Sequence, residues 1–170
     1  KWPFIDRFLV TCAAYRVPVK IVLNKIDLYR DDPELVEKVK LFHSIYEDAG
    51  YQIKDVSVAE NIGIDELRSE CNNGGISLFS GVSGVGKSSL IKALDPSLEP
   101  KISQISDKHL QGRHTTTFYE IYPLQGGGFI IDTPGINSAV HPTHKEITLD
   151  RLRSCSADDV IVYVISVDNY

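Results

Sequence analysis

The sequence predicts an α/β fold in which a mostly parallel six-stranded sheet, with one antiparallel strand, lies between two layers of helices. Apolar, strand-like runs alternate with helical patterns along most of the 170 residues, and polar or glycine-rich turns follow several of these runs. In a parallel sheet such turns gather at the carboxyl ends of the strands, where ligands bind. The length suits one domain with a sizeable core.

The first half of the chain is expected to alternate between helix and strand. Apolar residues on one face of the run 4–15 predict an amphipathic helix, and the apolar run 19–24 predicts a buried strand. Asp32 and Gly50 mark the two ends of a helix at 33–49, because aspartate caps helix starts and glycine follows helix ends. The remaining elements of this half are a strand at 51–57 and a helix at 63–72.

The second half supplies the other strands of the sheet. A strand at 75–80 is followed by a helix at 87–95. Residues 117–132 predict an antiparallel hairpin that turns at the three glycines 126–128. The last expected elements, after the hairpin strands 117–123 and 128–132, are a short helix at 144–154 and a buried parallel strand at 160–167.

Residues 81–88, hereafter the phosphate loop, fit the pattern G-x-x-x-x-G-K-[S/T] directly after an expected strand. The glycines let backbone N–H groups surround phosphates, Lys87 adds positive charge, and the Ser88 hydroxyl can ligate Mg²⁺. A plain turn does not need Lys-Ser at this offset, so the fold is expected to be of the P-loop NTPase type. The predicted nucleotide contacts are Ser83, Gly84, Val85, Gly86, Lys87, Ser88 and Ser89.

Residues 24–27, hereafter the guanine loop, carry the N-K-x-D signature after another expected strand. Asp27 can accept hydrogen bonds from N1–H and the exocyclic amine of guanine, which adenine does not offer at those positions. Asn24 is expected to tie this loop to the phosphate loop, and the Lys25 stem is expected to lie over the base. The chain is therefore predicted to bind GTP or GDP, and an ATPase is disfavoured.

Two further segments match the switch regions of GTPases. Asp132 and Gly135 form a D-x-x-G motif, in which Asp132 holds Mg²⁺ through a water and the Gly135 N–H senses the γ-phosphate. Either Thr115 or Thr116 is expected to close over the nucleotide, and spacing does not separate them. His114 is better explained as a solvated or structural residue than as a base, although its place near the phosphates leaves the role of a base open. The predicted catalytic set is Lys87, Thr115, Thr116 and Gly135, and the predicted metal set is Ser88, Thr116 and Asp132.

Ser57 and Val58 stand where many GTPases carry Ser-Ala-Lys, with a backbone N–H that meets the guanine carbonyl. The match is loose, since valine replaces alanine, but a backbone contact tolerates that change. Both residues are therefore expected to contact the base.

The motifs occur in an unusual order, because the guanine loop precedes the phosphate loop. Residues 4–136 resemble the circularly permuted ribosome-assembly GTPases of the RsgA (YjeQ) family in this motif order. They also resemble that family in three segments, G-V-S-G-V-G-K-S-S-L, G-R-H-T-T-T and D-T-P-G. The resemblance implies a GTPase that acts late in small-subunit maturation and is stimulated by that partner. It also implies slow intrinsic hydrolysis, since Ile136 replaces the usual catalytic glutamine.

The family carries an oligonucleotide-binding barrel before the GTPase domain and a zinc domain after it, and we expect neither here. Cys12, Cys71 and Cys155 lack metal-ligand spacing, so they are predicted to be reduced thiols with no zinc site. The whole chain, 1–170, is predicted to be one permuted GTPase domain. In the family, a strand like 160–167 precedes the first helix, so relocated termini are expected, with a natural fragment as the alternative.

The net charge of −5 argues against tight nucleic-acid binding by this domain alone, and no DNA partner is expected. No apolar run is long enough to span a bilayer and the start lacks a signal-peptide pattern, so a cytoplasmic setting without a membrane partner is predicted. The alternative function is a folded or engineered module that holds GDP without significant turnover.

Overall fold

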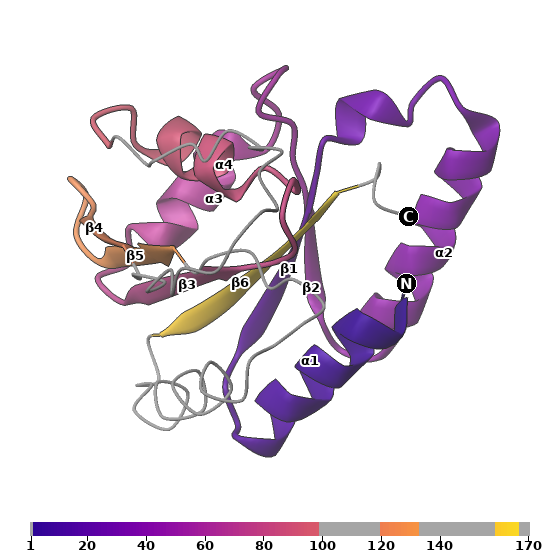
Figure 1. Cartoon of the computed structure of the whole chain (residues 1–170), viewed down its shortest axis with the longest axis horizontal. Helices are drawn as coiled ribbons and strands as arrows, with labels where there is room; N and C mark the ends of the chain where they lie inside the picture. Colours follow the sequence, from indigo (N-terminus) through magenta and orange to yellow (C-terminus); the bar gives the residue numbers. More distant parts are fainter. Residues whose placement is uncertain (1, 99–119, 133–158, 167–170) are drawn as a thin grey trace, which may run out of the picture.

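The computed structural model describes residues 2–98, 120–132 and 159–166. Four α-helices and six strands lie within these residues (Figure 1). The helices are α1 (Trp2–Ala14), α2 (Pro33–Asp48), α3 (Ile64–Cys71) and α4 (Lys87–Leu94), with a short 3-10 helix, η1 (Ile26–Leu28). The strands are β1 (Val19–Asn24), β2 (Gln52–Asp55), β3 (Ile76–Ser80), β4 (Glu120–Pro123), β5 (Phe129–Asp132) and β6 (Val160–Ser166).

The strands form one sheet in the order β2-β1-β6-β3-β5-β4. Every neighbouring pair is parallel except β4 with β5, which is antiparallel. The predicted mostly parallel six-stranded sheet with one antiparallel strand is therefore confirmed. The expected helix at 144–154 lies outside the described residues.

Strand β6 lies in the middle of the sheet, between β1 and β3 (Figure 1). Its residues pair with β1 from Val19↔Ile161 to Asn24↔Ser166 and with β3 from Ser77↔Val160 to Ser80↔Tyr163. The five residues from Ile161 to Ile165 are all buried, as expected for a strand covered on both faces. The last strand of the chain thus joins the two halves of the sheet.

Helices cover both faces of the sheet (Figure 1). On one face, α1 and α2 pack against β1 and β6, where the Phe8 and Tyr163 rings lie 4.4 Å apart. On the other face, α3 and α4 pack against β1, β3, β5 and β6 around Phe79 and Ile130. This arrangement is the expected three-layer sandwich.

Local signals place two of these elements. The Asp32 carboxylate caps α2 by accepting the Glu34 and Leu35 N–H groups at 2.9 and 3.2 Å. The β4–β5 hairpin closes where the Leu124 N–H donates to the Gly128 carbonyl at 3.1 Å. Gly127 and Gly128 have φ angles of 97° and 90°, which glycine adopts readily, so the predicted glycine turn is confirmed.

Candidate functional site

The polar turns singled out in the sequence meet at one edge of the sheet. The guanine loop follows β1, residues 56–62 follow β2, the phosphate loop follows β3, and Asp132 ends β5. These four strands all run in the same direction, because each pairs in parallel with a neighbour and β6 pairs in parallel with both β1 and β3. Their carboxyl ends therefore lie at the same edge of the sheet. Brought together in this way, the turns form the candidate site.

The phosphate loop runs from Gly81 to the first turn of α4, and backbone crowding explains its glycines. A Cβ atom on Gly86 would lie 2.5 Å from the Asn24 amide nitrogen, and one on Gly81 would collide with the Val164 carbonyl oxygen. Gly84 and Gly86 have φ angles of 86° and 93°. The loop thus passes close to β6 and the guanine loop in a conformation that other residues strain to adopt.

Lys87 is the first residue of α4, and its side chain turns back under the phosphate loop. Its ammonium group donates to the Gly81 carbonyl at 2.8 Å and to the Val82 carbonyl at 3.2 Å, and only 8% of the residue is exposed. Burial lowers the pKa of Lys87, although the nearby Asp132 carboxylate opposes that shift. A largely buried cation at a helix start is suited to neutralising phosphate charge.

The other predicted phosphate contacts surround this lysine. Ser83, Gly84 and Ser89 are exposed, Gly86 and Ser88 are half-buried, and Val85 is buried. The loop therefore presents its polar residues outward while Val85 anchors it in the core.

Asn24 and Lys25 join the guanine loop to the phosphate loop. The buried Asn24 amide donates to the Val85 carbonyl at 2.9 Å, and the Lys25 ammonium donates to the Gly84 carbonyl at 2.9 Å. Lys25 has φ 64° and ψ 38°, a left-handed conformation that is uncommon outside glycine and that turns the loop toward its partner. Two segments about 60 residues apart in sequence are thereby held side by side.

Ser57 holds the Asp27 carboxylate in place. The Ser57 hydroxyl donates to Asp27 Oδ1 and also accepts the Glu60 N–H at 3.1 Å. The Ile26 N–H donates to the Val56 carbonyl at 3.2 Å, so the two loops are also joined through the backbone. Val58 packs against the core. The sequence predicts a base contact for Ser57, and the motif gives no sign of this side-chain bond to Asp27.

Asp132 lies at the end of β5, and its Oδ1 atom is buried with no hydrogen-bond partner among the described residues. Burial raises its pKa to about 6; Lys87 lowers the pKa and the Glu120 carboxylate raises it. A buried carboxylate oxygen that has no donor among the described residues fits a hydrated divalent cation, since oxygen is the ligand atom that Mg²⁺ prefers.

Glu120 and Tyr122, which belong to none of the predicted motifs, lie on the strand beside Asp132. Glu120 is the direct cross-strand partner of Asp132, and the Tyr122 hydroxyl donates to Glu120 Oε2. The expected hairpin could have identified both residues, because pairing 117–123 with 128–132 places an acidic side chain opposite Asp132 once the register is known.

The predicted switch residues Thr115, Thr116 and Gly135, and also His114, lie outside the described residues. Cys12 and Cys71 are buried thiols, and burial raises the pKa of Cys71. Within the described ranges, no group of three or more His, Cys, Asp or Glu residues is arranged to hold a metal ion. In the same ranges, no helix is long and apolar enough to cross a membrane.

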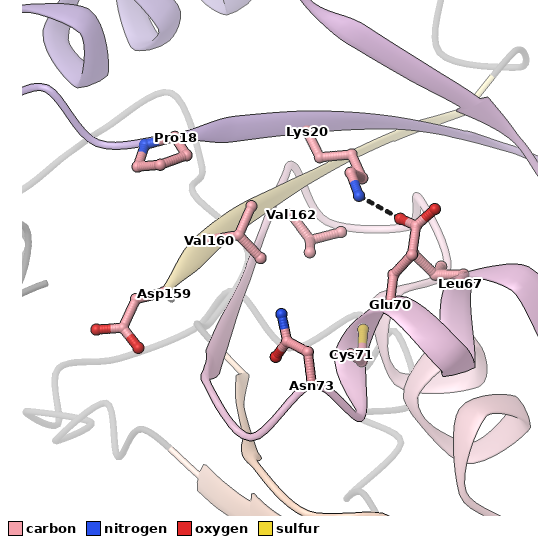
Figure 2. A pocket seen from close by; sticks show the side chains of 9 residues that line it. All are labelled: Pro18, Lys20, Leu67, Glu70, Cys71, Asn73, Asp159, Val160 and Val162. Carbon is pink, nitrogen blue, oxygen red and sulfur yellow. Dashed lines mark hydrogen bonds and ion pairs between the residues drawn. The ribbon is translucent and has the colours of Figure 1, made fainter. Parts of the chain in front are cut away.

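A separate pocket of about 320 Å³ lies at the opposite edge of the sheet, near the amino ends of β1 and β6 (Figure 2). Its one lysine, Lys20, forms an ion pair with Glu70, and Glu70 also pairs with Lys54 at 2.7 Å. Because its positive charge is already paired, this pocket does not resemble a phosphate site. The lining residues are Pro18, Lys20, Leu67, Glu70, Cys71, Asn73, Asp159, Val160 and Val162.

Comparisons with known proteins identify related sequences and a related structure. A protein-family model described as RsgA GTPase matches residues 1–141. The chain is 50% identical over 133 residues to the small ribosomal subunit biogenesis GTPase RsgA of Phocaeicola vulgatus, covering 78% of this chain and 42% of that protein. It is 41% identical over 131 residues to the protein of the same name from Thermotoga maritima, covering 77% and 43%.

A solved structure gives the same result. The crystal structure of YjeQ from Thermotoga maritima superposes with a TM-score of 0.62 at 35% identity, covering 81% of this chain and 43% of that one. The chain thus spans about four tenths of the length of these relatives.

Proposed function

Because the chain belongs to the RsgA GTPase family, we propose that its site binds GTP or GDP with Mg²⁺ and hydrolyses GTP slowly. The observation that carries the proposal is the bond from the Asn24 amide to the Val85 carbonyl, with the Lys25–Gly84 bond beside it. These contacts hold the guanine loop beside the phosphate loop, which supports one site for both the base and the phosphates. A lone phosphate loop would not choose between ATP and GTP.

Each half of the nucleotide has candidate partners in this site. Asp27, held by Ser57, supports guanine recognition, because its carboxylate can accept both donors on that edge of the base. Lys25, Ser57 and Val58 are proposed to complete the base site. The backbone of 83–89 and the Lys87 ammonium are proposed to surround the phosphates, with the lysine exchanging its carbonyl contacts for phosphate oxygens.

Ser88 and Asp132 are proposed to hold the metal, with Thr116 as the third member of the set. Asp132 Oδ1 is buried without a hydrogen-bond donor in the part of the chain that the structure describes, which supports this assignment because a metal-bound water would donate to it. When bound, Mg²⁺ would supply positive charge that offsets the negative charge of the phosphates. The protein's part is to orient the phosphates through Lys87 and the loop N–H groups.

Slow turnover is proposed because Ile136 stands where GTPases usually carry a water-orienting glutamine. Thr115 or Thr116 and Gly135 are the proposed switch residues. A GDP-binding module with no turnover is the alternative, and phosphate release distinguishes the two.

The relatives named above are small ribosomal subunit biogenesis GTPases, which supports the small ribosomal subunit as a partner for this chain. A cytoplasmic setting is proposed together with that partner, and neither DNA nor a membrane is proposed. The guanine loop precedes the phosphate loop, which supports one circularly permuted domain over residues 1–170. The expected relocation of the termini stays a prediction.

Titration with GDP and ADP in the presence of Mg²⁺ tests nucleotide binding. Selective GDP binding supports the proposal, whereas equal affinities or no binding contradict it. Single-turnover phosphate release from GTP then tests hydrolysis. Slow release that stops in the Lys87→Ala variant supports a GTPase, and no release from a chain that binds GTP favours the GDP-binding module.

A further inference from the structure

Glu120 and Asp132 lie side by side on the face of the sheet that carries the phosphate loop. They are register partners in the antiparallel pair β4–β5, so their side chains project from the same face. Tyr122 and Ile130, the next pair on this face, both pack in the core beneath α4. The two carboxylates are thus directed toward the helix that begins with Lys87.

Among the described residues, Asp132 lies near a second carboxylate and a single lysine. In that part of the chain, the charged groups that shift the pKa of Asp132 are the Lys87 ammonium, which lowers it, and the Glu120 carboxylate, which raises it. The Lys87 ammonium is already hydrogen-bonded to two phosphate-loop carbonyls. Two carboxylates close to one buried lysine form an environment that a divalent cation stabilises.

Tyr122 fixes the position of the second carboxylate. Its hydroxyl donates to Glu120 Oε2. Burial, together with the Glu120 and Asp132 charges, raises the pKa of Tyr122, so the phenol keeps its proton and remains a donor. The Glu120 side chain is therefore held beside Asp132, although its length and its partly buried position would otherwise allow several rotamers.

We propose that Glu120, oriented by Tyr122, is a positioning residue for the divalent cation at Asp132, acting through the cation's water shell and through its charge. This inference rests on the proposed function, because it assigns a new residue to the Mg²⁺ site of that function. Partners beyond the direct ligands of a metal commonly change its affinity by about 10- to 100-fold, and a partner that acts through water lies at the lower end.

The test measures binding of a fluorescent GDP analogue to the purified chain, first in EDTA and then across a Mg²⁺ titration. Glu120→Gln is expected to raise the Mg²⁺ concentration for half-saturation about tenfold, while GDP affinity in EDTA and the melting temperature in EDTA stay unchanged. Tyr122→Phe is expected to raise the Mg²⁺ concentration for half-saturation about threefold. Glu120→Asp keeps the negative charge, so its Mg²⁺ concentration for half-saturation is expected to lie close to that of the parent chain.

Glu66→Gln is the matched control, because it removes one negative charge from the exposed first turn of α3. The inference is overturned if Glu120→Gln behaves like Glu66→Gln while Asp132→Asn shifts the Mg²⁺ response. It is also overturned if Glu120→Gln lowers the melting temperature and GDP affinity in EDTA, which would indicate a structural role. If the parent chain binds no GDP or shows no Mg²⁺ response, the proposed function itself fails and the inference falls with it.

Discussion

The Asn24 amide nitrogen lies 2.9 Å from the Val85 carbonyl oxygen, across a sequence separation of 61 residues. Asn24 is 2% exposed, so this bond forms away from solvent, where an unpaired amide or carbonyl is costly. Because Gly86 packs against the same amide, any side chain there affects both loops at once. The geometry of the guanine loop is thus coupled to that of the phosphate loop.

Replacing Gly86 with alanine should disrupt this coupling. The new Cβ would lie 2.5 Å from the Asn24 amide nitrogen at a φ of 93°, so both a clash and backbone strain are expected. We expect GDP affinity to fall more than tenfold and stability to fall by about 1–3 kcal/mol. Calorimetric titration and chemical denaturation measure the two effects.

Gly50→Ala is the control for Gly86→Ala. Gly50 has a φ of 88°, but a Cβ there would meet nothing within 4 Å. The Gly50→Ala variant should therefore lose stability through backbone strain alone, and its GDP affinity should stay unchanged. Equal GDP affinities for the two variants would contradict the coupling of the loops.

Lys87→Ala should abolish nucleotide binding. The variant removes the buried ammonium group beneath the loop, which donates to the Gly81 and Val82 carbonyls. Among the described residues, no other side chain donates to these two carbonyls. Lys92→Ala, at an exposed position on the same helix, controls for the loss of a lysine and should bind normally. Unchanged GDP affinity in Lys87→Ala, measured by calorimetry, would refute the role of the phosphate loop.

Asp27→Asn should weaken the binding of guanine nucleotides and favour xanthine nucleotides. The asparagine amide donates a hydrogen bond at the position where the aspartate carboxylate accepts one. Ser57→Ala should weaken GDP several-fold without changing base preference, since it only releases the Asp27 carboxylate. Competition between GDP and XDP measures both effects. Asp31→Asn, an exposed neighbour, is the control, and an unchanged base preference in Asp27→Asn would contradict guanine recognition by residue 27.

His43 should make stability depend on pH. Its two ring nitrogens contact Glu47 Oε1 at 3.0 Å and Asp55 Oδ1 at 2.9 Å. Burial opposes the charged form, but the hydrogen bonds and charges of the two carboxylates outweigh it and raise the pKa of His43. The folded state therefore binds the proton more tightly than the unfolded state, so this stabilisation is complete below the unfolded pKa, about 6.5, and disappears as pH rises through the folded value.

Urea denaturation at pH 5.5 and pH 8.5 measures this contribution. The parent chain should lose more stability between these two pH values than His43→Gln does, since glutamine keeps hydrogen bonds but carries no titrating proton. A parent and a variant with the same pH dependence would show that the contacts of His43 do not stabilise its protonated form.

Several features of this fold could be predicted from short stretches of sequence. The apolar run of β1, the cap of α2 at Asp32 and the glycine turn of the β4–β5 hairpin depend on neighbouring residues, so their local patterns identify them. The phosphate and guanine loops are also contiguous motifs whose chemistry is set by residue type and spacing. The side-chain bond from Ser57 to Asp27 and the pairing of Glu120 with Asp132 were not predicted.

The sequence by itself determined the alternation of strands and helices, the predicted ligand class and the residues of each motif, because these depend on periodicity and on contiguous spacing. Tertiary structure alone decided that β6 lies between β1 and β3, that Asn24 meets Val85, and that Glu120 faces Asp132. Strand order and register depend on contacts between residues far apart in the chain. A one-residue change in register would turn Glu120 to the other face of the sheet, and local pattern does not specify that register.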